Sequence, residues 1–161
     1  MGDFSGNHLI LLAKNMKGYK NLIKIVSKAY TEGSYGRPRT DRVELEKYHE
    51  GLICCSACIG GEIPRYIRED KIKEAKEAAL WYKSIFGDDY YLELQLHKAT
   101  VEFANHNTYK IQEKVNDKLI EFSRELGIKL VCTNDVHFVD EEHAEAHDRL
   151  ICLGTGKDLD D

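Results

Sequence analysis

The chain has 161 residues, of which 42% are hydrophobic and 32% charged, the composition of one soluble globular domain. Its formal net charge of -5 and pI near 5.8 argue against a broad nucleic-acid-binding surface, which needs an excess of Lys and Arg, but leave a local basic patch open. It contains no apolar run of membrane-spanning length, no signal peptide and no disulfide pattern among its five cysteines. We therefore expect a cytoplasmic protein without membrane contacts.

Strands and helices are expected to alternate from the start of the chain. Residues 1–7 are polar and indicate a loop or a re-set start, and the apolar residues 9–13 then predict a buried strand. Asn15 can cap a helix over residues 16–30, in which apolar side chains recur at helical spacing. Gly33 supplies the stop for that helix.

A loop and a second strand follow. We expect the loop over residues 33–40, after which Asp41 can cap a short helix that ends near residue 48. Residues 51–55 predict the second strand. The pair Gly60-Gly61 after this strand is not expected to start a helix.

The second half of the chain continues the alternation. Asp70 can cap an amphipathic helix over residues 71–86, whose alanine and aromatic side chains form one apolar face. The later elements are expected, in order, as a strand over residues 90–95, a helix over 108–126, a buried strand over 128–132 and a helix over 141–153. Such alternation with short links predicts a single α/β domain with a mainly parallel sheet or barrel.

Asp135 and His137 follow the last predicted strand and carry the most informative chemical signal. Side chains two apart on a strand share a face, so these two would project together beyond its carboxyl end. This is where α/β folds place their chemistry, and both side chains are ordinary ligands for zinc or manganese. The alternative is that Asp135 caps the next helix and His137 is a loop residue.

Cys58 is a candidate ligand at the end of the second predicted strand. Its C-x-x-C spacing with Cys55 could indicate a redox pair or half of a zinc site, but no second C-x-x-C occurs and no helix is expected to start after it. As a single ligand, Cys58 would project from the same rim as Asp135 and His137. His8, just before the first strand, is a weaker candidate because a lone histidine there is more often hydrogen-bonded than ligating.

Two further groups have a functional and a plainer interpretation. Arg37 and Arg39 flank a proline in a loop and could hold a phosphate bidentately, although a solvated charged loop is commoner. His143 and His147 share one face of the last helix, but Ala144 stands where the zinc-protease pattern requires Glu. A solvated helix face is therefore favoured for this histidine pair.

Several motifs along nearly the whole chain occur in the order of a known family. They are His8-Leu-Ile-Leu-Leu-Ala-Lys-Asn15 with Gly18-Tyr-Lys-Asn-Leu22, Arg37-Pro-Arg-Thr-Asp41, Gly51-Leu-Ile-Cys-Cys-Ser-Ala-Cys58, Phe86-Gly-Asp-Asp-Tyr-Tyr-Leu-Glu-Leu-Gln95, Thr133-Asn-Asp-Val-His137, and Ala146-His-Asp148 with Thr155-Gly-Lys157. This ordered series resembles the PHP (polymerase and histidinol phosphatase) domain of the bacterial DNA polymerase III alpha subunit. The last motif is similar to the polymerase version rather than to free-standing PHP phosphatases.

The resemblance implies a PHP-type distorted (βα) barrel of mainly parallel strands with flanking helices. It also implies up to three divalent metal ions, zinc or manganese, held at the barrel mouth by nine residues. Four of those positions fall in this chain as His8, Cys58, Asp135 and His137, with Asp135 and His137 as catalytic residues. The family's earlier motifs have no counterpart before His8, so residues 1–161 are expected to form the carboxyl-terminal portion of a PHP domain with an incomplete metal site.

The resemblance further implies a DNA-directed DNA polymerase in which the PHP region supplies metal-dependent phosphoesterase or 3′-5′ proofreading exonuclease chemistry. DNA and other replicase subunits are the implied partners. We expect the isolated chain to be inactive and to form homo-oligomers through sheet edges that the missing strands would have covered. The alternatives are a non-catalytic scaffold that stabilises the polymerase and contacts partner subunits and, less favoured, a free-standing PHP phosphatase.

Overall fold

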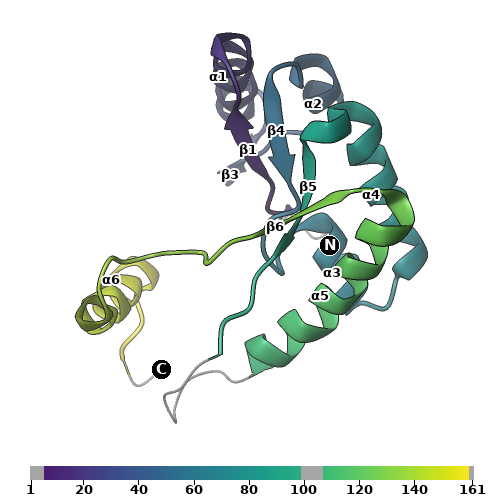
Figure 1. Ribbon diagram of the computed structural model, residues 1–161. Coiled ribbons are helices and arrows are strands. Elements are labelled where there is room, and N and C mark those ends of the chain that lie inside the picture. The colour runs from purple at the N-terminus through teal and green to yellow at the C-terminus, as the bar shows by residue number, and fades with distance from the viewer. Residues whose placement is uncertain (1–5, 99–106, 160–161) are drawn as a thin grey trace.

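The computed structural model describes residues 6–98 and 107–159 and contains one four-stranded sheet (Figure 1). The strands are β1 (Ile10–Ala13), β4 (Leu52–Cys55), β5 (Tyr90–Leu94) and β6 (Lys129–Cys132). They lie in the order β1-β4-β5-β6. Strands β4, β5 and β6 are parallel, whereas β1 is antiparallel to β4. The expected α/β fold with a mainly parallel sheet is confirmed.

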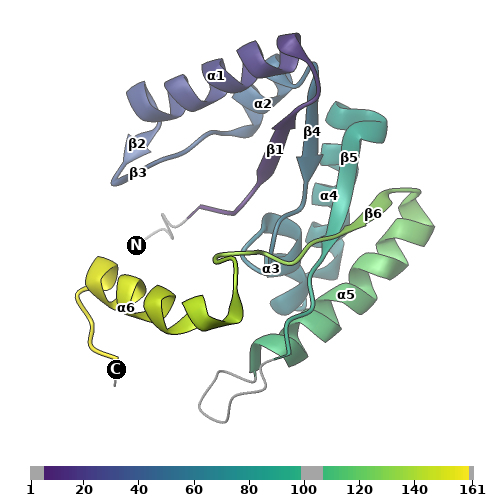
Figure 2. The same cartoon turned by 60° about the vertical axis from the view of Figure 1, so that its left-hand side comes forward.

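The helices are α1 (Met16–Thr31), α2 (Arg42–Tyr48), α3 (Glu62–Arg68), α4 (Ile72–Phe86), α5 (Asn107–Leu126) and α6 (Ala144–Thr155), with short 3-10 turns at Gly87–Asp89 and at η2 (Glu141–His143). Figures 1 and 2 show α3, α4 and α5 gathered beside the sheet, whereas α6 stands apart from it. None of the described helices is long and apolar enough to cross a lipid bilayer.

Two of the predicted helix caps are present. The Asn15 side chain accepts a hydrogen bond from the Gly18 amide at 3.0 Å, and the Asp41 side chain accepts one from the Glu44 amide at 3.0 Å. Each bond satisfies an amide that has no partner within its own helix. These local bonds explain why α1 and α2 begin where the sequence predicts.

The prediction that Asp70 caps α4 is wrong. Asp70 has a left-handed φ of 56° and closes the preceding helix α3, because the Asp70 amide donates to the Ile67 carbonyl and the Lys71 amide to the Tyr66 carbonyl. The Asp70 carboxylate instead accepts a hydrogen bond from Lys114 at 2.8 Å. An Asp between two closely spaced helices can therefore end the first instead of starting the second.

Helix α3 was not expected, and the prediction that no helix starts after Gly60-Gly61 is wrong. Gly61 is the N-cap, and its carbonyl accepts the first helical bond from the Arg65 amide. A Cβ atom at Gly61 would lie 2.1 Å from the Ser56 carbonyl oxygen. Glycine therefore serves close backbone approach here, and not helix breaking. The predicted loop over residues 33–40 likewise contains a small hairpin, formed by β2 (Ser34–Tyr35) and β3 (Arg37–Pro38).

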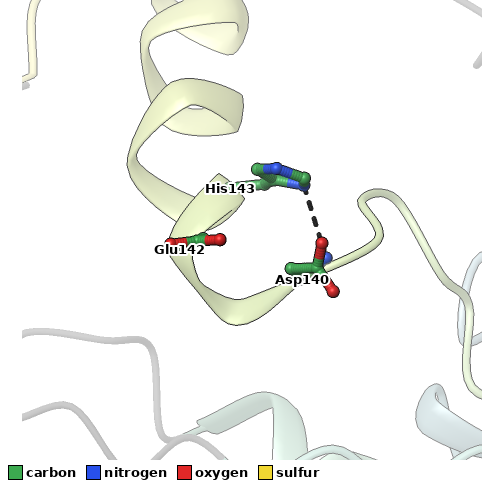
Figure 3. Close-up of side chains that lie close together, drawn as sticks. All are labelled: Asp140, Glu142 and His143. Carbon is green, nitrogen blue, oxygen red and sulfur yellow. Dashed lines mark hydrogen bonds between the residues drawn. The ribbon is translucent and has the colours of Figure 1, made fainter.

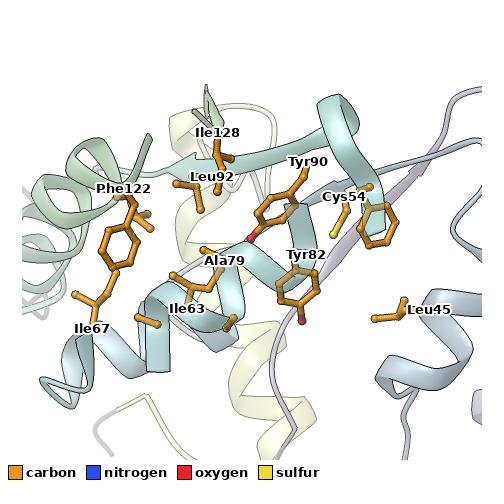
Figure 4. Close-up of a cluster of buried hydrophobic side chains, with 14 of the residues drawn as sticks. Leu45, Cys54, Ile63, Ile67, Ala79, Tyr82, Tyr90, Leu92, Phe122 and Ile128 are labelled. Atoms are coloured by element: carbon orange, nitrogen blue, oxygen red, sulfur yellow. The ribbon is translucent and has the colours of Figure 1, made fainter. Parts of the chain in front are cut away.

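One hydrophobic core lies between the sheet and helices α3, α4 and α5 (Figure 4). Its largest fully buried side chains are Tyr90, Phe122, Leu52, Ile63, Ile67, Leu92 and Leu119. The rings of Tyr82 and Tyr90 stack with centroids 5.3 Å apart. Burial of this apolar surface is the main force that holds the helices on the sheet.

Strands β1 and β6 are at the two ends of the described sheet and are less buried than expected. Ile10 and Leu12 are exposed, whereas Leu9 and Leu11 pack against the core. All but Val131 of the four residues in β6 are exposed. The prediction of two buried strands is wrong for the described residues, because each has a neighbouring strand on one side only.

Gly18 of α1 lies against the turn that leads into β4. A Cβ atom on Gly18 would lie 1.8 Å from the carbonyl oxygen of Gly51. Gly51 itself has a positive φ of 76°, which favours glycine. The position of α1 against the sheet therefore depends on the absence of a side chain at Gly18.

We predict that Gly18→Ala lowers the free energy of unfolding by about 1–3 kcal/mol, because the new methyl group would force the helix away from the turn. Urea denaturation monitored by circular dichroism measures the change. Gly154→Ala is the matched control, since Gly154 is also helical and has nothing within 4 Å of its Cβ position. Equal stability of Gly18→Ala and the unsubstituted chain would contradict this close approach.

We also predict that the chain self-associates at micromolar concentration through β1 and its exposed Leu12. Leu12→Lys should weaken this association at least about tenfold, since burial of one leucine side chain is worth about 1.5–3 kcal/mol. Sedimentation velocity gives the dissociation constants, with Leu150→Lys on α6 as the control for a lost exposed leucine. A monomeric unsubstituted chain at these concentrations would refute the prediction.

Candidate metal centre

The sheet topology places the predicted ligands at one end of the strands. Because β1 is antiparallel to β4, the residues that enter β1 lie at the same edge as the residues that leave β4. The parallel strands β5 and β6 end at this edge too. His8, Cys58 and the segment 133–137 therefore all lie beyond the carboxyl ends of the parallel strands, which we call the carboxyl edge. Figure 2 shows this for the chain that precedes β1 and the chain that follows β6.

His8 and Cys58 are in direct contact. The imidazole Nδ1 lies 3.3 Å from the Cys58 Sγ, and the His8 amide donates to the Gly60 carbonyl at 3.1 Å. His8 also forms an isolated parallel bridge with Gly61. Ala57, just before Cys58, adopts a left-handed φ of 61° although it is buried. The turn after β4 thus holds a half-buried thiol against an imidazole from a remote segment.

Asp135 and His137 form the second pair. His137 Nε2 lies 3.5 Å from Asp135 Oδ1, and both side chains are exposed. Asp135 has a left-handed φ of 48° and does not cap a helix, since Asp140 is the N-cap of the following turn η2. The His147 ring lies 5.5 Å from the His137 ring between centroids. His147, expected on a solvated helix face, is therefore a neighbour of the predicted ligand His137.

The four side chains form two pairs and not a closed site. Among the described residues, no three of His8, Cys58, Asp135 and His137 bring ligand atoms within 4.8 Å of one another. Their convergence on one metal ion stays a prediction. The donor set fits it chemically, because one thiol, two imidazoles and one carboxylate are all ligands that zinc accepts, and imidazole and carboxylate also suit manganese.

A belt of buried polar side chains, missed by the sequence analysis, lies behind this edge. Ser56, Glu93 and Gln95 are buried at the ends of β4 and β5. The Ser56 hydroxyl accepts from the Glu93 amide at 2.8 Å, and Glu93 Oε1 accepts from both Gln95 Nε2 and the Thr133 hydroxyl. The alternation of Glu93 and Gln95 with leucines was the available signal, but it indicated only a strand.

Glu93 has one unused oxygen beside the site. Its Oε2 is buried and has no hydrogen-bond partner among the described residues. Glu93 and Cys58 line the same cavity of about 10 Å³ together with Gln95, Gln112 and Asn116. A space of this size accommodates about one water molecule, which would satisfy the orphaned oxygen.

A second group of possible ligands lies in the segment before α6 (Figure 3). The ligand atoms of Asp140, Glu142 and His143 lie within 4.8 Å of one another, and all three residues are exposed. His143 Nδ1 accepts a hydrogen bond from the Asp140 amide at 3.3 Å, which is a capping contact. The need to cap this turn is sufficient to explain Asp140 and His143, and Glu142 is an exposed acidic residue of the same turn.

Arg37 and Arg39, the predicted phosphate-binding pair, have different surroundings. Arg37 is exposed in the small hairpin. Arg39 lines a cavity of about 210 Å³ with Lys28 and with three carboxylates, those of Glu32, Asp41 and Glu44. Three carboxylates oppose anion binding in that cavity. Phosphate binding by these arginines stays a prediction.

All five cysteines are free thiols, and two of them are strongly shielded from solvent. Burial and, to a smaller extent, the charge of Glu93 together raise the pKa of Cys55 from its ordinary value of 9.0 to about 11. Burial also raises the pKa of Cys54. These two thiols are therefore harder to ionise than an ordinary thiol, which makes them poorer metal ligands and nucleophiles.

Comparison with known proteins gives a consistent set of matches. The sequence model of the family described as PHP domain matches residues 2–97. The chain is 53% identical over 149 residues to the DNA polymerase III subunit alpha of Borreliella burgdorferi, a match that covers 92% of this chain and 12% of that protein. The same subunit of Treponema pallidum is 44% identical over 155 residues, and that of Thermus aquaticus 42% over 154. Each of these two matches covers 96% of this chain and 12% of the relative.

We predict that the free energy of unfolding falls as the pH rises from about 9 to 11. The unfolded Cys55 thiol ionises near its ordinary pKa of 9.0 while the folded thiol, with a pKa of about 11, resists, so the stability present below pH 9 is lost above it. Each such thiol contributes up to about 1.4 kcal/mol per pH unit. Urea denaturation between pH 8 and 11 measures the slope, which should be shallower in Cys55→Ala.

Thiol labelling gives an independent control on the same burial. At pH 8, iodoacetamide should modify the exposed Cys132 in the folded chain and reach Cys54 and Cys55 only in denaturant. Equal labelling of Cys55 and Cys132 in the folded chain would contradict the buried position of the β4 thiols.

Proposed function

Because this chain belongs to the PHP domain family, we propose that it is a segment of a DNA polymerase III alpha subunit whose carboxyl sheet edge contributes ligands to a metal-dependent phosphoesterase centre. The chain spans about 12% of the length of the relatives it matches, so polymerase activity would reside largely in other parts of such a protein. DNA and other replicase subunits are the proposed partners, and the cytoplasm the proposed location.

The contact between His8 and Cys58 is the observation that carries the proposal. An imidazole nitrogen and a thiol sulfur lie 3.3 Å apart although 50 residues separate them along the chain. Two soft or borderline ligands at this distance can share one divalent ion after small side-chain rotations. The Asp135 and His137 pair extends from the same edge and adds a carboxylate and a second imidazole.

Each residue has a role that its surroundings support. A divalent ion held here would supply Lewis-acid activation of a phosphate ester and of water. The backbone bond from the His8 amide to Gly60 holds His8 beside Cys58, so that nitrogen and sulfur face the same space. Asp135 would supply negative charge that partly neutralises the ion, and His137, whose Nε2 lies 3.5 Å from Asp135 Oδ1, would supply a nitrogen ligand beside it. The proposed reaction is hydrolysis of a phosphodiester at a DNA 3′ end.

A scaffold role is the second candidate, and exposed apolar side chains on α1 favour it. Five of them recur at intervals of three and four residues along one face: Met16, Tyr19, Ile23, Val26 and Tyr30. The opposite face of α1 packs in the domain through Gly18, Asn21 and Ile25. Apolar side chains on both faces are typical of a helix that is buried between two domains or subunits. A free-standing phosphatase has no comparable support, since the similar proteins are polymerase subunits.

We predict that Asp135→Asn in the complete alpha subunit lowers metal-dependent release of 3′ nucleotides at least about 100-fold, because a neutral amide replaces a ligating carboxylate. Nucleotide incorporation should stay unchanged. Release from labelled single-stranded DNA with Mn²⁺ or Zn²⁺ measures the effect, together with metal content by mass spectrometry. Glu142→Gln, which neutralises an exposed carboxylate in the capping group, is the matched control.

The isolated chain should release nucleotides negligibly and bind Mn²⁺ or Zn²⁺ weakly at most, since the resemblance to PHP domains assigns four of the nine ligand positions to it. Unchanged metal content and release in Asp135→Asn would remove Asp135 from the site. Robust release by the isolated chain would show that the four residues suffice, and would refute the division of ligands.

A further inference from the structure

The segment that carries Asp135 is tied to the rest of the domain by His97. The His97 Nε2 lies 2.8 Å from the carbonyl oxygen of Asn134, the residue just before Asp135. His97 is half-buried in the chain that follows β5, and 37 residues separate it from Asn134. This contact connects the ends of two neighbouring strands outside the sheet ladder.

Gln112 fixes the tautomer of the His97 ring. The His97 backbone amide can only donate, and it donates to Gln112 Oε1 at 2.7 Å. This bond fixes the orientation of the Gln112 side-chain amide, because the atom that accepts must be its oxygen. Gln112 Nε2, a donor, lies 2.9 Å from His97 Nδ1, which must therefore accept. The ring proton is then on Nε2, where it donates to the Asn134 carbonyl.

The anchor for this arrangement is rigid. Gln112 is buried on α5, and both of its polar groups are used by His97. One helical turn later, Asn116 donates to the Gln95 carbonyl at 2.9 Å. One face of α5 therefore holds the end of β5 at two positions.

The bond to Asn134 bears directly on the backbone of Asp135. The Asn134 carbonyl and the Asp135 amide belong to one planar peptide group, so orienting the carbonyl orients the bond about which φ of Asp135 is measured. That φ is 48°, a conformation that residues other than glycine adopt at a cost and keep only where the surroundings fix it. Thr133 is tethered as well, through its hydroxyl to Glu93 and its amide to Leu94.

We infer that His97, locked by Gln112, is a positioning residue that holds the Asn134 peptide and so keeps Asp135 in the left-handed backbone that presents its carboxylate beside His137. The role of Asp135 as a ligand rests on the proposed function, whereas the positioning itself does not. Within the described part of the chain, the hydrogen bonds of His97 go to Gln112 and to the main chain of Asn134, so His97 acts on Asp135 through the backbone. Hydrogen bonds that orient the ligating residues commonly change the affinity of a site for its metal ion.

The first test uses the metal-free chain and the variants His97→Ala and Gln112→Leu. Order parameters of the Asp135 and Val136 amides, from ¹⁵N relaxation, should fall from about 0.85 in the unsubstituted chain to below about 0.6 in both variants. His97→Gln should recover part of the rigidity, because its amide nitrogen can reach the Asn134 carbonyl. His49→Ala is the matched control, since it also removes a histidine contact with a backbone carbonyl, that of Glu46 at 2.7 Å.

The second test measures Mn²⁺ affinity in the complete alpha subunit. His97→Ala and Gln112→Leu should weaken binding roughly 10- to 100-fold, and His49→Ala should leave it unchanged. A lower melting temperature with unchanged order parameters at Asp135 would show a merely structural role and overturn the inference. Mobile Asp135 and Val136 amides in the unsubstituted chain would overturn it too. If the unsubstituted subunit bound no metal, the proposed function would fail, and the order parameters would still decide the positioning role.

Discussion

The antiparallel pairing of β1 with β4 is the constraint on which the candidate site depends. The register pairs Ile10 with Cys55, so the chain entering β1 meets the chain leaving β4. A parallel β1 would have placed His8 at the opposite edge of the sheet, a strand length away from Cys58. One reversed strand in a mainly parallel sheet thus brings the beginning of the described chain to the edge where the parallel strands end. The contacts of His8 with Gly60 and Cys58 follow from that direction.

Much of the fold was predictable from local sequence signals. The helices capped by Asn15 and Asp41 form as expected because a side-chain cap and helical periodicity act within a few residues. Helix α3 was not predictable in this way, since it has only seven residues and begins at a glycine that packs against Ser56. The burial of β6 was also misjudged. The apolar composition of a strand indicates that its side chains should be buried. It does not indicate which other segment buries them.

The location of the candidate ligands at one end of the strands was predictable from the sequence, whereas the hydrogen bonds that support them were not. Cys58 and Asp135 could be assigned to one edge because both follow predicted parallel strands. Gln112 and His97 could not, since a polar residue on a helix and a histidine in a loop are ordinary on a solvated surface. Their importance depends on bonds to residues far along the chain, which periodicity and capping rules do not describe.

The same long separations determine when the site can form during folding. His8 must wait until Cys58, 50 residues later, has been synthesised and β4 has paired with β1, and His97 must wait a further 37 residues for Asn134. Loop closure of this length costs entropy that only a completed sheet repays, so these contacts form late. A metal ion therefore cannot guide the early steps of folding through this native ligand set. During synthesis on the ribosome, the His8 imidazole and the Cys58 thiol remain separate until β4 has emerged, and His97 remains separate from Asn134 until β6 has emerged.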